Sequence, residues 1–168
     1  MRKKPELSLR TRALQYLARR EYSRAELRGK LLQYAQTDDD FEQFSDSSGA
    51  DSSGLGDLDA LLDDLTARSW LSDARAVTQL LHAKRNRFGT QRITHELRQK
   101  GIAEELIAAA LPALKESELE AARDVWQKKF GAAPQDAKEK SRQIRFLQSR
   151  GFGFEVIFQV LRVVETEE

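Results

Sequence analysis

Apolar side chains recur at helical spacing along nearly the whole of this 168-residue chain. Leu27 and Leu31 stand four residues apart, and Ile93 and Leu97 repeat that spacing. Broader apolar stripes follow in three segments: Leu58, Leu61, Leu62 and Leu65; Leu106, Ile107, Ala110, Leu111 and Leu114; and Val156, Ile157, Val160, Leu161 and Val164. One apolar face per segment is typical of amphipathic helices. No comparable segment alternates with the period of two that a half-buried strand requires, so we predict an all-α fold.

Several helix boundaries are marked by their end residues. Ser23-Arg24-Ala25-Glu26 has the form of a capping box, in which the serine hydroxyl and the glutamate carboxylate accept from unpaired backbone N–H groups at a helix start. Gly101 and Gly151 each follow a basic last turn, as expected for glycines just past a helix end.

The same pattern repeats along the chain about every fifty residues. Tyr22 precedes Leu27 as Phe88 precedes Ile93, and Phe88-Gly89 recurs as Phe130-Gly131. We predict a tandem array of three three-helix repeats, which would bury a core between neighbours and expose an extended surface. The predicted divisions are a flexible basic N-terminus and three repeats, over residues 1–8, 9–73, 74–115 and 116–168.

One segment of the first repeat breaks this pattern. Residues 37–56 are rich in Asp, Ser and Gly and contain few apolar residues, so they predict a disordered acidic insertion between two helices. Such a segment could shield a basic surface in the same chain by imitating nucleic acid. We favour a solvated insertion without that role, because a segment with so few apolar residues buries too little surface to offset the entropy that it would lose on ordering.

Net charge alternates in step with the repeat, although the whole chain carries only +1. Three basic blocks, with +7, +6 and +5, cover residues 1–36, 67–101 and 123–151. Three acidic blocks, with −10, −4 and −3, cover residues 37–66, 102–122 and 152–168. Basic charge gathered in blocks on a nearly neutral protein predicts a polyanionic partner.

The lysines and arginines of the basic blocks are the candidate partner-binding residues. A solvated surface charge is the ordinary role of any one of them, but their recurrence in three blocks favours contact with a phosphate backbone or an acidic protein groove. The candidates are Arg19, Arg20, Arg24, Arg28, Lys30, Lys84, Arg85, Arg87, Arg92, Arg98, Lys100, Lys128, Lys129, Lys138, Lys140, Arg142, Arg145 and Arg150. Aromatic residues interleave with them, and we expect these rings in the core rather than stacked on bases: Tyr16, Tyr22, Phe88, Trp126 and Phe130.

Composition and spacing argue against catalysis. The chain has no cysteine, which excludes disulfides and thiolate metal sites and favours the reducing cytoplasm. His82 and His95 lie on different predicted helices without metal-ligand spacing, and residues 151–154 lack the Lys-Ser/Thr of a phosphate loop. We predict that the protein is not an enzyme and needs neither metal nor cofactor. No apolar run is long enough to cross a bilayer, so we expect no membrane partner.

Five tracts occur in order along the chain: Leu58 to Leu65, Trp70 to Arg75, Arg87-Phe88-Gly89, Ile93 to Ile102 and Arg145 to Phe152. Together they resemble the RecX family, bacterial regulators of the RecA recombinase. The resemblance implies a curved, elongated, monomeric array that lodges in the groove of the RecA–DNA filament and restrains its activities. The implied partners are RecA, single-stranded DNA and double-stranded DNA. The chain departs from the usual family pattern at Ala76, where an aromatic residue is common, and in its acidic insertion.

Two functions stay open on the sequence alone. The resemblance favours a regulator that inhibits the ATPase, strand-exchange and co-protease activities of a recombinase filament. The basic blocks by themselves would suffice for a general DNA-binding helical-repeat protein without sequence specificity.

The basic blocks generate a first prediction about bare DNA. If they contact phosphates, affinity should be the same for unrelated sequences and should fall steeply with salt, because each neutralised phosphate releases counterions. Fluorescence anisotropy with labelled oligonucleotides over a range of salt concentrations measures both properties. A flat salt dependence would point to a partner that is protein alone.

Overall fold

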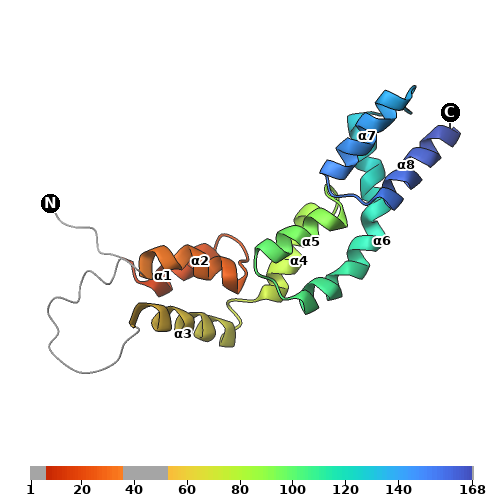
Figure 1. Cartoon of the computed structure of the whole chain (residues 1–168). Coiled ribbons are helices and arrows are strands. Elements are labelled where there is room, and N and C mark those ends of the chain that lie inside the picture. The colour runs from red at the N-terminus through yellow and green to blue at the C-terminus, as the bar shows by residue number, and fades with distance from the viewer. Residues whose placement is uncertain (1–6, 36–52, 168) are drawn as a thin grey trace, which may run out of the picture. The chain divides into compact units, whose positions relative to one another are not determined.

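Eight α-helices form the regular structure of the residues that the computed structural model describes, which are 7–35 and 53–167 (Figure 1). No strand occurs within these ranges, which confirms the predicted all-α class. The helices are α1 (Leu9–Leu17), α2 (Arg24–Ala35), α3 (Ser53–Ala67), α4 (Asp73–Lys84), α5 (Thr90–Gln99), α6 (Glu104–Lys129), α7 (Ala137–Ser149) and α8 (Phe154–Glu167).

The predicted flexible N-terminus and most of the predicted insertion fall outside the described residues. Because α3 begins at Ser53, the last residues of the segment 37–56 are helical and not part of a linker. Their Gly and Ser content suggested a linker, whereas the helix that follows extends back through them.

The chain divides into two units, residues 1–76 and 77–168. The first unit contains α1, α2 and α3, which correspond to the first predicted repeat. Its core is made chiefly by leucines of α2 and α3, among them the fully buried Leu27, Leu31, Leu58 and Leu62. These are the leucines at helical spacing in the sequence, so the apolar stripes mark the faces that pack together.

The second unit holds the second and third repeats, each around its own core. Val77, Ile93, Leu97, Ile107 and Leu114 belong to the core of the second repeat. The core of the third repeat includes a buried tryptophan and residues of α7 and α8: Trp126, Leu147, Phe152, Ile157 and Leu161.

Helix α6 contributes to both of these cores. It continues without a break through the predicted boundary between residues 115 and 116, so the third helix of one repeat and the first helix of the next are a single helix. Pro112 lies inside it and lacks the N–H that would bind one turn back, which is an established cause of bending. Figure 1 shows the bend of α6 between its contacts with α5 and those with α7 and α8.

The predicted helix ends are confirmed. The Glu26 N–H donates to the Ser23 hydroxyl over 3.0 Å, and the Ser23 N–H donates to the Glu26 carboxylate over 3.2 Å. Gly101 and Gly151 have φ of 70° and 87°, the left-handed conformation that glycine adopts without steric cost.

The second and third repeats meet at the start of α5. Its first N–H groups would otherwise be unpaired. The N–H groups of Gly89 and Gln91 donate to the carbonyl oxygens of Arg150 and Gly151 over 2.9 and 3.2 Å. The Thr90 N–H donates to the Glu118 carboxylate over 2.9 Å. We call this contact the repeat joint.

Backbone approaches backbone so closely at the repeat joint that a side chain does not fit. A Cβ atom on Gly89 would lie 2.2 Å from the Gly151 carbonyl oxygen, and one on Gly151 would lie 2.3 Å from the Arg92 Cβ. The recurring Phe-Gly pair is therefore not one structural motif. Gly89 begins α5 with φ of −77°, whereas Gly131 follows α6 with φ of +66°.

The repeat joint predicts opposite effects for two alanine substitutions. Gly89→Ala should destabilise the protein by about 1–3 kcal/mol, because the added methyl group overlaps backbone atoms. Gly29→Ala should stabilise it by about 0.5–1 kcal/mol, because Gly29 lies inside α2 with open space around it. Urea unfolding followed by far-ultraviolet circular dichroism measures both. Equal effects would show that the repeats are not held by this contact.

Candidate nucleic-acid interface

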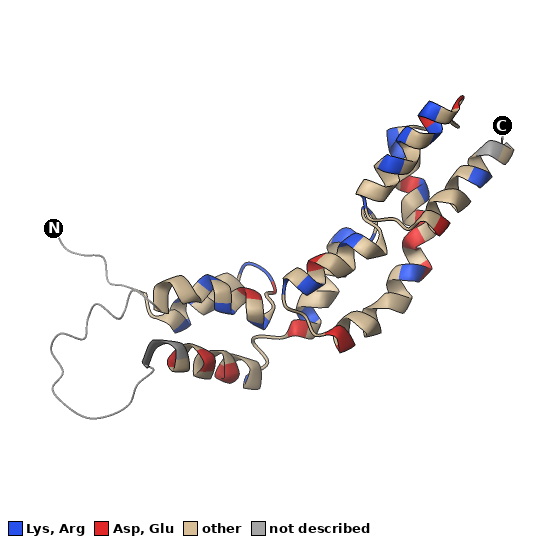
Figure 2. Cartoon of the chain, viewed as in Figure 1, with Lys and Arg blue, Asp and Glu red and all other residues tan. Residues whose placement is uncertain are grey.

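The predicted basic residues fall into two groups, and those of the first repeat are largely neutralised. Arg24 pairs with Asp63 over 2.7 Å, and Arg28 pairs with Asp59 over 2.9 Å. These pairs join α2 to α3, whose acidic residues are visible in Figure 2. Arg20 pairs with Glu26 over 3.0 Å. Within the described residues, Arg19 and Lys30 form no ion pair, and they are the exceptions in this repeat.

Ion pairs with arginines lower the pKa values of two carboxyl groups on α3. The hydrogen bond from Arg28 holds the pKa of Asp59 below its usual value. Hydrogen bonds from Arg10 and Arg68 do the same for the pKa of Asp64. Carboxylates that remain ionised beside these arginines leave little net positive charge on the α2–α3 face.

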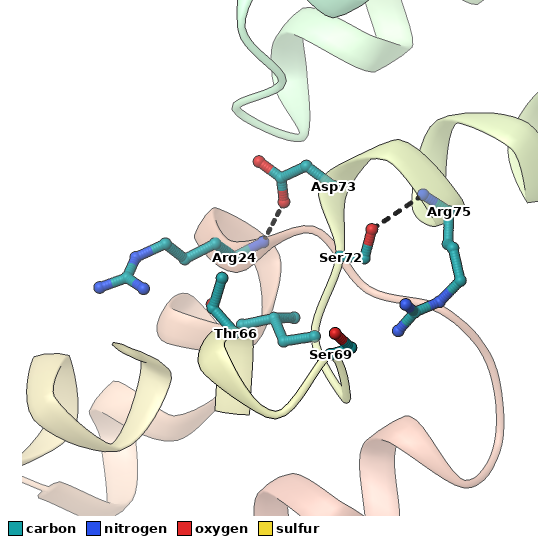
Figure 3. Close-up of a pocket in the computed structure, with 7 residues that line it drawn as sticks. Arg24, Thr66, Ser69, Ser72, Asp73 and Arg75 are labelled. Carbon is teal, nitrogen blue, oxygen red and sulfur yellow. Dashed lines mark hydrogen bonds between the residues drawn. The ribbon is translucent and has the colours of Figure 1, made fainter. Parts of the chain in front are cut away.

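A hollow of about 350 Å³ opens between the start of α2 and the turn before α4 (Figure 3). The Asp73 carboxylate accepts from the Arg24 N–H over 2.7 Å and so caps α2. Arg75 donates to Glu21 over 3.0 Å. The charged groups that line this hollow already have partners, since Arg24 also pairs with Asp63, so we interpret the hollow as a structural contact.

The second repeat also contains neutralised cations. Arg98 pairs with Glu104 and Lys84 with Glu96, each over 2.6 Å. Lys100 ends α5 and Lys140 lies in α7, and both have further interactions within the chain.

The remaining candidates form no ion pair with any described residue. They lie near the start of α5, along α7 and at the end of α6, where Figure 2 shows a concentration of basic residues on α7. They are Arg85, Arg87, Arg92, Lys128, Lys129, Lys138, Arg142, Arg145 and Arg150.

Several of these cations lie over three phenyl rings, those of Phe88, Phe146 and Phe130, and we call this group the cation–aromatic ladder. The Arg92 guanidinium lies 4.3 Å from the centroid of the Phe88 ring. Arg150 lies between two rings, 5.4 Å from Phe88 and 5.3 Å from Phe146. Phe146 contacts Phe130 edge-to-face at 5.3 Å. The members of the ladder are Arg87, Arg92, Phe88, Arg150, Phe146, Lys129, Phe130 and Arg142. Lys84, which pairs with Glu96, also lies 5.8 Å from the centroid of the Phe88 ring.

The rings of the ladder have two roles. Phe88, Phe130 and Phe146 are partly buried against the cores, and cations cover faces that the cores leave open. Trp126 and Tyr22 are buried, as the sequence predicted. Phe146 was not among the predicted aromatic residues. Its signal is the four-residue spacing of Arg142, Phe146 and Arg150, which places Arg142 and Phe146 on one face of α7 and Arg150 at the C-cap below them.

The ladder is suited to binding anions. The Arg92 guanidinium also donates to the Ser149 carbonyl oxygen over 3.1 Å, which ties the start of α5 to the end of α7. A guanidinium stacked on a ring keeps N–H groups at its edge, and these bind phosphate oxygens well.

Other kinds of site are absent from the described part of the chain. No group of three His, Cys, Asp or Glu side chains there could hold a metal ion. None of its helices combines the length and the apolar character needed to span a membrane.

Comparison with known proteins agrees with the resemblance seen in the sequence. Family models described as the first, second and third three-helix domains of RecX match residues 10–42, 72–111 and 116–161. The chain is 44% identical to regulatory protein RecX of Leptothrix cholodnii, over 98% of this chain and 94% of that protein. It is 41% identical to regulatory protein RecX of Chromobacterium violaceum, over 92% of this chain and 89% of that protein.

The fold has solved counterparts. The crystal structure of RecX from Lactobacillus salivarius matches with a TM-score of 0.70 and 17% identity, covering 94% of this chain and 95% of that one. This likeness and the family models confirm the three tandem three-helix repeats.

The ion pairs of α3 predict a specific acid sensitivity. Folding lowers the pKa values of Asp59 and Asp64, so their ionised carboxylates stabilise the folded state. This contribution is complete above the ordinary carboxyl pKa and is lost as pH falls through the lower pKa values of the folded protein. Melting temperature should therefore drop below about pH 4, and it should drop less in the double variant Asp59→Asn, Asp64→Asn.

Circular-dichroism melts over a series of acidic buffers measure this difference. Asp57→Asn is the matched control, because Asp57 lies on the same helix without an ion pair to any described residue. Identical acid sensitivity in all three proteins would contradict the prediction.

Proposed function

Because the chain belongs to the RecX family, we propose that it is a regulator that binds the RecA recombinase filament on DNA. In this proposal it inhibits the ATPase, strand-exchange and co-protease activities of the filament. The match of all three family domains, together with 44% identity over nearly the full length, is the observation that carries the proposal. The proposed compartment is the bacterial cytoplasm, where the filament assembles.

The proposed mechanism is stoichiometric binding and involves no chemical step. A tandem array has an extended surface that can contact several points on a repetitive partner. The unpaired cations of the second unit support contact with the DNA of the filament. Long-range attraction from such a surface would also speed association with a polyanionic assembly.

The ladder also favours a second function, that of a general DNA-binding protein without a recombinase partner. The two functions differ in one measurable property. A filament regulator should bind single-stranded DNA more tightly when RecA coats it. A general DNA-binding protein should bind coated DNA less tightly, because RecA covers the phosphates that it would contact.

The proposed function predicts inhibition of ATP hydrolysis by RecA. Purified protein added to RecA, single-stranded DNA and ATP should lower the steady-state rate in proportion to its concentration, until each binding position on the filament is filled. A coupled assay for ADP release follows the rate. Free DNA in excess distinguishes filament binding from simple sequestration of DNA, because it should not restore the rate. An unchanged rate with folded protein in excess over RecA would refute the proposed function.

A further inference from the structure

We propose that the cation–aromatic ladder is the phosphate-binding site for DNA, and that its phenyl rings are positioning residues for the cations. The paired arginines of the first repeat do not share this role. The inference rests on the DNA-binding part of the proposed function and does not depend on RecA. The ligand is the phosphodiester backbone, bound without regard to base sequence.

Electrostatic pairing separates the two groups of cations. For a phosphate to bind Arg24 or Arg28, it must replace the carboxylate of Asp63 or Asp59. That exchange of one anion for another yields little free energy. No described carboxylate pairs with Arg92 or Arg150, so a phosphate there gains new charge-assisted hydrogen bonds and releases counterions.

Geometry supplies the second argument. Long cationic side chains lose rotamer freedom when they bind a ligand. At the ladder part of this freedom is already lost, because the Arg150 guanidinium lies 5.4 Å from the Phe88 ring and 5.3 Å from the Phe146 ring. Arg92 is held by the Phe88 ring and the Ser149 carbonyl oxygen. The rings therefore hold the cations in place before DNA binds.

The path of the ladder supplies the third argument. It runs from the start of α5 across the repeat joint to the ends of α7 and α6, and all of these elements belong to the second unit. The backbone hydrogen bonds of Gly89 and Gln91 to residues 150 and 151 hold the two repeats together at this point. Cations that these joined elements hold close together can contact phosphates of one strand.

Two pairs of neutral variants of equal net charge test the assignment. Arg92→Gln with Arg150→Gln should weaken binding to a labelled oligo-dT about tenfold or more and should reduce the salt slope by about two phosphates. Arg24→Gln with Arg28→Gln removes the same charge from the first repeat and should change affinity less than about twofold. Equal losses from the two pairs would overturn the assignment of DNA to the ladder.

The role of the rings is tested with all charges kept. Phe88→Leu should weaken binding about two- to fivefold, because Arg92 and Arg150 lose the ring that holds them. Phe154→Leu is the matched control, since Phe154 is 56% exposed and no cation lies over its ring among the described residues. Unchanged affinity of folded Phe88→Leu would overturn the positioning role.

A second variant keeps this test valid if Phe88→Leu loses stability. Arg150→Lys keeps the charge but not the planar guanidinium that contacts the two rings, and it should also weaken binding severalfold. Arg123→Lys is its control, because Arg123 is an exposed residue of α6 that contacts no aromatic ring and forms no ion pair among the described residues. Because these assays use bare DNA, they can succeed while RecA inhibition fails, which would refute only the proposed function.

Discussion

The contact of Gly89 with Gly151 is the constraint on which the rest of the second unit depends. It gives the first N–H groups of α5 their acceptors and brings the start of one repeat to the end of the next. The same approach sets Arg92 and Phe88 beside Arg150, so that cations from two repeats form one row. Two residues without side chains thus determine where the charged side chains around them lie.

The alternating charge of the chain has two different structural meanings. In the first repeat, Arg24 and Arg28 face Asp63 and Asp59 in reversed order, so the basic helix and the acidic helix neutralise each other. In the third repeat, Glu155 of α8 forms no ion pair with α7 among the described residues. Blocks of similar net charge therefore differ in how much of that charge is available to a ligand.

Local features of the fold could be predicted from the sequence because they depend on neighbours along the chain. The amphipathic helices, the capping box of Ser23 and Glu26, and the turn at Gly101 are of this kind. The continuity of α6 could not be predicted from the sequence, because it depends on packing against the cores of both repeats. The ladder was missed because it depends on the repeat joint, which no spacing in the sequence reveals. The four-residue spacings of Arg24 and Arg28 and of Asp59 and Asp63 were visible, but only the packing of α2 on α3 shows that they match.

The repeats therefore share a fold while differing in what they offer to a partner. A three-helix unit needs only its apolar stripes to form, so its exposed positions are free to change without loss of the core. In the first repeat, acidic residues of α3 form ion pairs with the arginines of α2. In the third repeat, cations of α6 and α7 contact aromatic rings instead and form no ion pair with any described residue. Under the proposed function, the array would need surfaces of more than one kind, because its partner contains both protein and DNA. The first repeat, with its neutral face, is thus better suited to a protein surface than to the phosphate backbone.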